Sequence, residues 1–164
     1  MTNGNFPRIS WDQLFIEIAR LYARRSTCKY FKIGVVFVRN NRILTAGYNG
    51  PPKGEPHCEE VGCQKEDALG KRLPAGSGLC RGAHAEMNAI ANASTEGVNL
   101  SDTQVYCTFS PCFDCAKVLV NLGIKGFFYS DNYPEKENLM ARDLFQRQGV
   151  IVRRLEPSGG DQNA

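Results

Sequence analysis

Apolar residues recur at helical spacing near the start of the chain. Ser10-Trp11-Asp12-Gln13 has the form of a capping box, in which the first side chain accepts a hydrogen bond from the third helical amide. The sequence therefore predicts an amphipathic helix to about Arg25, with an apolar face made by Trp11, Leu14, Phe15, Ile18, Leu21 and Tyr22.

Two β-prone runs follow this helix. Residues 33–38 and 43–48 are apolar and rich in β-branched side chains, and Asn40-Asn41 between them favours a tight turn. Further along, the pattern predicts helices from about 83 to 94, from 111 to about 122 and from 135 to 148, and strands at 104–108, 126–129 and 150–152.

The order of these elements predicts a three-layer α/β/α fold around a five-stranded mixed sheet. Strands separated by helices imply crossover connections and parallel pairing, whereas the opening hairpin is antiparallel. We expect a single domain over residues 1–157 and a flexible tail at 158–164. Residues 50–82, rich in Gly, Pro and charge, form an insertion that something must hold in place.

Charge and composition exclude several classes of protein. The 164 residues include 20 Lys and Arg and 17 Asp and Glu, without a long basic run. This argues against a polynucleotide-binding stripe and allows a local phosphate pocket. No apolar segment approaches the ~20 residues that span a membrane, and residues 1–8 lack the apolar core of a signal peptide. We expect a cytoplasmic protein that binds neither membranes nor polynucleotides.

Two short motifs carry the candidate chemistry, His84-Ala85-Glu86 and Pro111-Cys112-Phe113-Asp114-Cys115. One His and two Cys leave a tetrahedral Zn²⁺ with one open position, as in catalytic sites, and such a zinc brings the pKa of its water close to neutrality. Glu86 is placed to move protons beside His84, Cys112 and Cys115. The combined pattern is a known signature of zinc nucleobase deaminases. A redox Cys-x-x-Cys pair or a closed structural zinc remains an alternative.

Seven cysteines without a secretory signal indicate metal ligands or buried thiols rather than a disulfide framework. Cys107 lies in a β-prone run and is predicted to be a core residue. Four thiols remain, three of them in the insertion. They predict a second, structural zinc, for which His57 is a competing ligand, and free thiols or a pair oxidised on isolation are the alternatives. The four are Cys28, Cys58, Cys63 and Cys80.

The chain resembles the deoxycytidylate (dCMP) deaminases of the cytidine deaminase superfamily from Ser10 to about Val152. The His-Ala-Glu and Pro-Cys-x-x-Cys motifs are typical of the whole superfamily. The Gly-Tyr-Asn-Gly and Arg-Ser-x-Cys motifs restrict the resemblance to the enzymes that act on nucleotide monophosphates. The matching stretches are residues 25–28, 42–50, 57–58, 80–82, 84–90, 110–117 and 121–125.

The resemblance implies zinc-dependent conversion of dCMP to dUMP and ammonia, which supplies thymidylate synthesis, with Glu86 as the proton carrier. It also implies a homo-oligomer, typically a hexamer, activated by dCTP and inhibited by dTTP. Residues 29–32 and Val35 depart from the family pattern near that effector site. The implied substrate contacts are Ser26 at the 5′-phosphate, Asn49 at the sugar or base, Tyr133 beside the ring, and Ala85 and Ser110. The implied effector contacts are Gly47, Tyr48, Asn49 and Gly50.

Two alternatives stay open. The first is deamination of another free base, nucleoside or nucleotide, such as cytidine, CMP or guanine. The second is a nucleotide-sensing or competence-associated protein whose zinc is structural. The presence of Glu86 favours an enzyme over a binding protein, because a binding protein does not need a carboxylate that transfers protons beside its metal.

Overall fold

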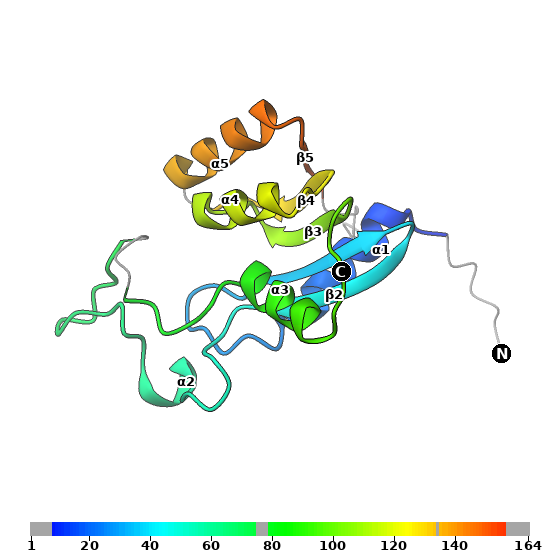
Figure 1. The fold of residues 1–164 in the computed structure, drawn as a ribbon. Helices are drawn as coiled ribbons and strands as arrows, with labels where there is room; N and C mark the ends of the chain where they lie inside the picture. Colours follow the sequence, from blue (N-terminus) through cyan, green and yellow to red (C-terminus); the bar gives the residue numbers. More distant parts are fainter. Residues whose placement is uncertain (1–7, 75–78, 134, 157–164) are drawn as a thin grey trace, which may run out of the picture.

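The computed structural model describes residues 8–74, 79–133 and 135–156, so the predicted tail at 158–164 lies outside the described residues. Within them, five strands form one sheet in the order β2-β1-β3-β4-β5 (Figure 1). Their bounds are β1 Gly34–Arg39, β2 Arg42–Tyr48, β3 Gln104–Phe109, β4 Gly126–Asp131 and β5 Ile151–Arg154. The predicted five-stranded mixed sheet is confirmed.

The hairpin of β1 and β2 turns at Asn40 and Asn41, whose φ angles of 53° and 58° lie in the left-handed region. Asn tolerates that conformation, and two such residues match the twist of the flanking strands. β1 then lies between β2 and β3 and pairs antiparallel with both. Consequently β2 and β3 run in the same direction without pairing with each other. Among the described strands, direct parallel pairing occurs only from β3 to β4 and from β4 to β5.

Helices cover both faces of the sheet, because alternate strand residues are apolar on each side. The helix α1 (Trp11–Ala23) packs on one face over Val36, Val38, Tyr106 and Phe128. On the other face lie α3 (Ala85–Thr95), α4 (Phe113–Asn121) and α5 (Glu135–Arg147) (Figure 1). The three-layer architecture predicted from the sequence is therefore confirmed.

The first helix begins where its sequence predicts. Ser10 Oγ accepts a hydrogen bond from the Gln13 amide at 3.2 Å, and the helix ends at Ala23. In its first turn Asp12 accepts a hydrogen bond from the buried Tyr106 hydroxyl at 2.6 Å and pairs with Arg153. Burial, followed by this hydrogen bond, raises the pKa of Tyr106.

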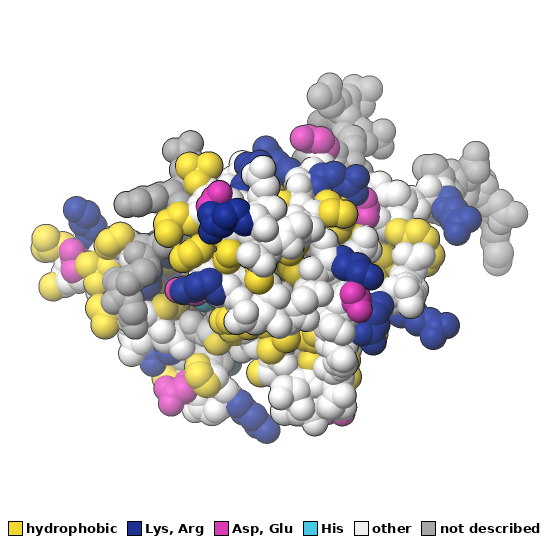
Figure 2. Space-filling model, turned by 45° about the horizontal axis from the view of Figure 1, so that its top comes forward, with side chains coloured by type: hydrophobic (Ala, Val, Ile, Leu, Met, Phe, Trp, Pro, Cys, Tyr) yellow, Lys and Arg dark blue, Asp and Glu magenta, His cyan; other side chains and the backbone are white. Residues whose placement is uncertain are grey.

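The described parts of the insertion, residues 50–74 and 79–82, extend away from the sheet, at the lower left of Figure 1. The insertion contains a short helix, α2 (Cys58–Val61), and is tied by isolated bridges between Gly50 and Ala83 and between Glu66 and Arg72. A helix of four residues is too short to show a period in the sequence, which is why it was not predicted. Hydrophobic side chains gather on this segment at the left of Figure 2, and Leu69 is 93% exposed.

No described helix is both long enough and apolar enough to cross a membrane.

Candidate active site

Two helix starts meet at one edge of the sheet. His84 is the N-terminal cap of α3, and Cys112 is the cap of α4, where its Sγ accepts a hydrogen bond from the Cys115 amide at 3.4 Å. These helices follow β2 and β3, which run in the same direction, so both N-termini lie beyond the carboxyl ends of their strands. Ligands bind at this edge in open α/β sheets, and exposed helix amides there favour thiolates.

The three predicted ligand atoms come together. His84 Nδ1 lies 3.2 Å from Cys112 Sγ and 3.4 Å from Cys115 Sγ, and all three atoms lie within 4.8 Å of one another. Ligand atoms around a tetrahedral Zn²⁺ are about 3.5–3.8 Å apart, from bond lengths of about 2.0–2.3 Å. The spacing and the donor types therefore fit zinc. In the described part of the chain, no other three His, Cys, Asp or Glu residues meet in this way.

Mutual contact shifts the protonation of these groups. A hydrogen bond from Cys115, followed by one from His84, lowers the pKa of Cys112 to about 4 despite its burial. The contact with Cys112 raises the pKa of His84 to about 9, and the pKa of Cys115 is also raised. A cluster that already holds a thiolate attracts a cation, and a metal binds as it displaces the remaining protons.

Glu86 lies in the first turn of α3 and is only 5% exposed. Burial, and then the negative charge of Cys112, raises the pKa of its carboxyl group. Glu86, His84 and Cys112 line one cavity of about 500 Å³. A buried carboxyl with a raised pKa can both accept and return a proton near neutral pH.

Three predicted substrate residues, Asn49, Ser110 and Tyr133, line the same cavity. The Tyr133 amide donates a hydrogen bond to Ser110 Oγ at 2.8 Å, and its ring lies 5.4 Å from that of Phe31. Phe31 in turn packs edge-on against Phe109 at 5.7 Å. Phe31, Phe109 and Tyr133 thus form an aromatic wall. This wall could not be predicted from the sequence, because an isolated Phe in a loop carries no periodic signal.

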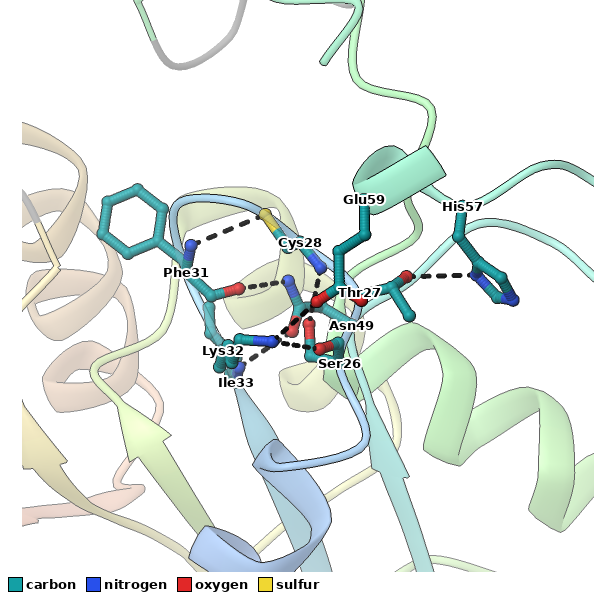
Figure 3. A network of polar contacts seen from close by, with 9 residues as sticks. All are labelled: Ser26, Thr27, Cys28, Phe31, Lys32, Ile33, Asn49, His57 and Glu59. Atoms are coloured by element: carbon teal, nitrogen blue, oxygen red, sulfur yellow. Dashed lines mark hydrogen bonds and ion pairs between the residues drawn. The ribbon is translucent and has the colours of Figure 1, made fainter. Parts of the chain in front are cut away.

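Both polar atoms of the Asn49 side chain form hydrogen bonds with backbone groups (Figure 3). Its Oδ1 accepts from the Ile33 amide at 2.8 Å, and its Nδ2 donates to the Phe31 carbonyl at 2.9 Å. Asn49 thus holds the segment that carries the aromatic wall.

Two other predicted contacts lie apart from the cavity surface. Ser26 is buried, its hydroxyl accepts from the Cys28 amide at 3.2 Å, and its carbonyl accepts from Lys32 at 2.7 Å (Figure 3). Neither Ser26 nor the buried Ala85 is among the residues that line the cavity. Their direct contact with substrate stays a prediction.

Of the four predicted effector residues, two line the cavity and two do not. Gly47 is buried against the backbone of α3, and the Tyr48 carbonyl accepts from Asn88 Nδ2 at 2.8 Å. Asn49 and Gly50 line the cavity. An effector role for these residues also stays a prediction.

All four cysteines proposed for a second zinc line the cavity, although no three of their sulfurs lie within 4.8 Å of one another. Burial raises the pKa of Cys58, and the nearby thiols of Cys28 and Cys63 raise it further. His57 Nδ1 lies 3.1 Å from Thr27 Oγ1, which joins α2 to the segment before β1 (Figure 3).

A three-layer α/β/α fold with a His-Cys-Cys metal site at two helix N-termini defines the class of zinc-dependent deaminases. The sequence model of the cytidine and deoxycytidylate deaminase zinc-binding region matches residues 9–131, three quarters of the chain. The chain belongs to this family, as the resemblance predicted.

Individual relatives agree with this assignment. ComE operon protein 2 of Bacillus subtilis is 38% identical over 149 residues, which are 91% of this chain and 73% of that protein. The deoxycytidylate deaminase of Schizosaccharomyces pombe is 37% identical over 160 residues, 96% of this chain, but the chain spans only 48% of that protein. The dCMP deaminase of cyanophage S-TIM5, solved with dCMP and dUMP, superposes with a TM-score of 0.74 at 28% identity over 92% of this chain and 100% of that one.

Proposed function

We propose that this chain catalyses the hydrolysis of dCMP to dUMP and ammonia, with Glu86 as the acid–base residue. The observation that carries the proposal is the meeting of three zinc-ligand atoms beside a buried carboxyl group in one cavity. A cavity of about 500 Å³ is within the range of about 300–1,000 Å³ that small-molecule sites occupy.

The residues of the site divide the reaction between them. His84, Cys112 and Cys115 would hold the zinc, which supplies a Lewis acid that activates a water molecule for attack. Glu86 takes a proton from that water and delivers it to N3 of the cytosine ring. The oxygen of that water bonds to C4 of the ring. As the C4–N bond then breaks, Glu86 takes the remaining proton of the new hydroxyl group and passes it to the departing amine, so that water and dCMP give dUMP and ammonia.

The choice of dCMP rests on the relatives. Deoxycytidylate deaminases are among the most similar curated proteins, and the cyanophage enzyme was solved with dCMP and dUMP. The name of the Bacillus relative states no reaction. A non-catalytic zinc protein is disfavoured by Glu86, since burying a carboxyl group costs stability and buried carboxyl groups with a shifted pKa cluster at functional sites.

The test is a comparison of substrates. The zinc-loaded protein is incubated separately with dCMP, CMP, deoxycytidine and dCTP, and deamination is followed by the change in ultraviolet absorbance. We expect turnover of dCMP at least about tenfold above the others, the effect of one well-placed polar contact. Preference for an unphosphorylated substrate would retain the zinc chemistry and contradict the substrate. No turnover of any of the four with zinc bound would favour a non-catalytic role.

We further propose that Cys28, Cys58, Cys63 and Cys80 bind a structural zinc that holds the insertion. Their common position in the lining of one cavity supports this, as does the rise in the pKa of Cys58 to which Cys28 and Cys63 contribute after burial. Four thiolates would close the coordination shell. We expect two zinc ions per chain in the purified protein. A single zinc, with four thiols open to alkylation, would contradict the second site.

We also propose regulation by dCTP and dTTP and assembly into a homo-oligomer, as the resemblance implies. Exposed apolar side chains on α1 and α5, Leu21 at 58% and Leu139 at 63%, supply surface that an assembly would cover. Adding each nucleotide to the dCMP assay tests regulation, and the mass measured by light scattering tests assembly. An unchanged rate or a monomeric mass would contradict the respective proposal.

A further inference from the structure

Three cationic side chains of the insertion line the cavity: Lys65, Arg72 and Arg81. In the sequence they look like ordinary charges of a polar loop. In the structure Lys65 is only 6% exposed. The Nε atoms of Arg72 and Arg81 are buried and have no hydrogen-bond partner.

A buried charge is expensive unless it is paired, and Lys is rarely buried without a partner. Among the described residues, the ammonium group of Lys65 has neither an ion-pair nor a hydrogen-bond partner. Glu66, the next residue, is engaged elsewhere: it accepts from Lys29 Nζ at 3.1 Å and from the Tyr30 hydroxyl. The protein itself therefore leaves this cation without an anion.

The two acidic residues that line the cavity do not supply an anion for Lys65. Asp114, which also lines the cavity, pairs with Lys117 at 2.7 Å. Glu86 lies in the first turn of α3 beside the His-Cys-Cys cluster, and not on the insertion. The described lining of the cavity thus has more positive than negative charge at the insertion.

Arg72 is held in a way that leaves its hydrogen-bond donors available. Its Cζ atom lies 4.8 Å from the centre of the Tyr30 ring and 4.7 Å from that of Phe31. Stacking of this kind uses the faces of the guanidinium group, whereas its N–H groups lie in its plane. The same Phe31 ring contacts Tyr133, so Arg72 adjoins the aromatic wall of the cavity.

We propose that Lys65, with Arg72 and Arg81, is the anion-binding end of the cavity and holds the 5′-phosphate of the substrate nucleotide. This inference rests on the proposed function and assigns the phosphate to the insertion instead of Ser26, whose hydroxyl is used within its own loop. A monophosphate is dianionic near neutral pH and lies at the opposite end of the nucleotide from the reacting ring. One molecule can therefore meet both Glu86 and these cations.

A competing role for the cations is to balance the four cysteines. Burial raises the pKa of the Cys58 thiol, and the positive charge of Arg81 opposes that rise, so Arg81 lies near this thiol. A zinc bound by four thiolates carries a net charge of about −2 and would be stabilised by nearby cations. Lys65 is the best residue with which to separate the two roles, because it is the most buried of the three.

The test compares Lys65→Met with Lys71→Met, which removes the same charge from an exposed side chain of the same segment. Binding of dUMP and of deoxyuridine is measured by calorimetry, and kcat/KM for dCMP is measured in parallel. We expect Lys65→Met to weaken dUMP binding and lower kcat/KM about 10- to 100-fold, with deoxyuridine binding unchanged. Lys71→Met should change each value less than about twofold.

Thermal unfolding and zinc content complete the test. Met replaces a buried unpaired charge with an apolar chain of similar length, so the free variant should melt at or above the wild-type temperature with its zinc intact. Loss of zinc, or equal loss of dUMP and deoxyuridine binding, would overturn the proposal in favour of the charge-balancing role. Unchanged dUMP binding would also overturn it. Wild-type protein that binds dUMP through Lys65 but does not deaminate dCMP would contradict only the proposed function.

Discussion

Replacing Gly47 by Ala is expected to damage the active site from a distance. Gly47 lies in β2, where the strand packs directly against the backbone of α3. A Cβ atom built at this residue would lie 2.6 Å from the Ala85 carbonyl oxygen and 2.6 Å from the Ala89 amide nitrogen. Both are backbone atoms, so a side chain cannot swing away. Restoring an ordinary contact of 3.4 Å requires the helix to move by about 0.8 Å.

A movement of α3 also displaces His84 and Glu86, because His84 is the N-terminal cap of this helix and Glu86 lies in its first turn. Overpacking of this size costs about 1–3 kcal/mol, or about 2–12 °C in Tm for a domain of this length. A misplacement of about 1 Å at a reacting group can lower a rate about a hundredfold. We therefore expect kcat for Gly47→Ala to fall by up to about a hundredfold at temperatures where the variant remains folded.

Gly34→Ala is the matched control. Its Cβ would lie 2.0 Å from the Ala19 carbonyl oxygen, on the opposite face of the sheet against α1, which carries no site residue. This variant should lose at least as much stability and keep kcat within about threefold. Unfolding by urea and initial rates separate the two quantities. Equal loss of kcat in both variants would mean that destabilisation, and not movement of α3, lowers the rate.

Three further outcomes follow from the site and the core. Glu86→Gln should retain zinc and lower kcat by about a hundredfold to ten-thousandfold, because it removes the proton carrier; a near-normal rate would exclude that role. Removing zinc with a chelator should abolish deamination and added Zn²⁺ should restore it, whereas activity that persists in zinc-free protein would contradict metal dependence. Tyr106 has a raised pKa, so the unfolded chain ionises first above about pH 10 and stability falls there. Tyr106→Phe should flatten that fall, as measured by urea denaturation at about pH 9 and 11; an identical slope would refute the assignment.

Local patterns predicted the parts of the molecule that depend on near neighbours in the sequence. Ser10 caps its helix, Asn40-Asn41 forms the hairpin turn, and the ligands of the His-Cys-Cys site stand at two helix starts. Each feature is decided within a few residues, by a cap, a φ angle or a ligand spacing.

Features that depend on distant parts of the chain were not predicted. Nothing in the run from Gly34 to Arg39 indicates that β1 separates β2 from β3, because pairing is chosen by tertiary packing. The bonds from Asn49 to Phe31 and Ile33 span 18 and 16 residues. The burial of Lys65 could not be predicted either, since a single Lys in a polar segment is usually exposed to solvent.

We propose that the His-Cys-Cys site of this chain deaminates dCMP. The most direct measurement is to incubate the pure, zinc-loaded protein with dCMP and to quantify dUMP and ammonia, with Glu86→Gln beside it. We expect dUMP and ammonia to form in equal amounts in the wild-type protein and at a greatly reduced rate in the variant. If folded wild-type protein with a full complement of zinc forms no dUMP, the site is not a dCMP deaminase; if both proteins form dUMP at the same rate, Glu86 is not the proton carrier.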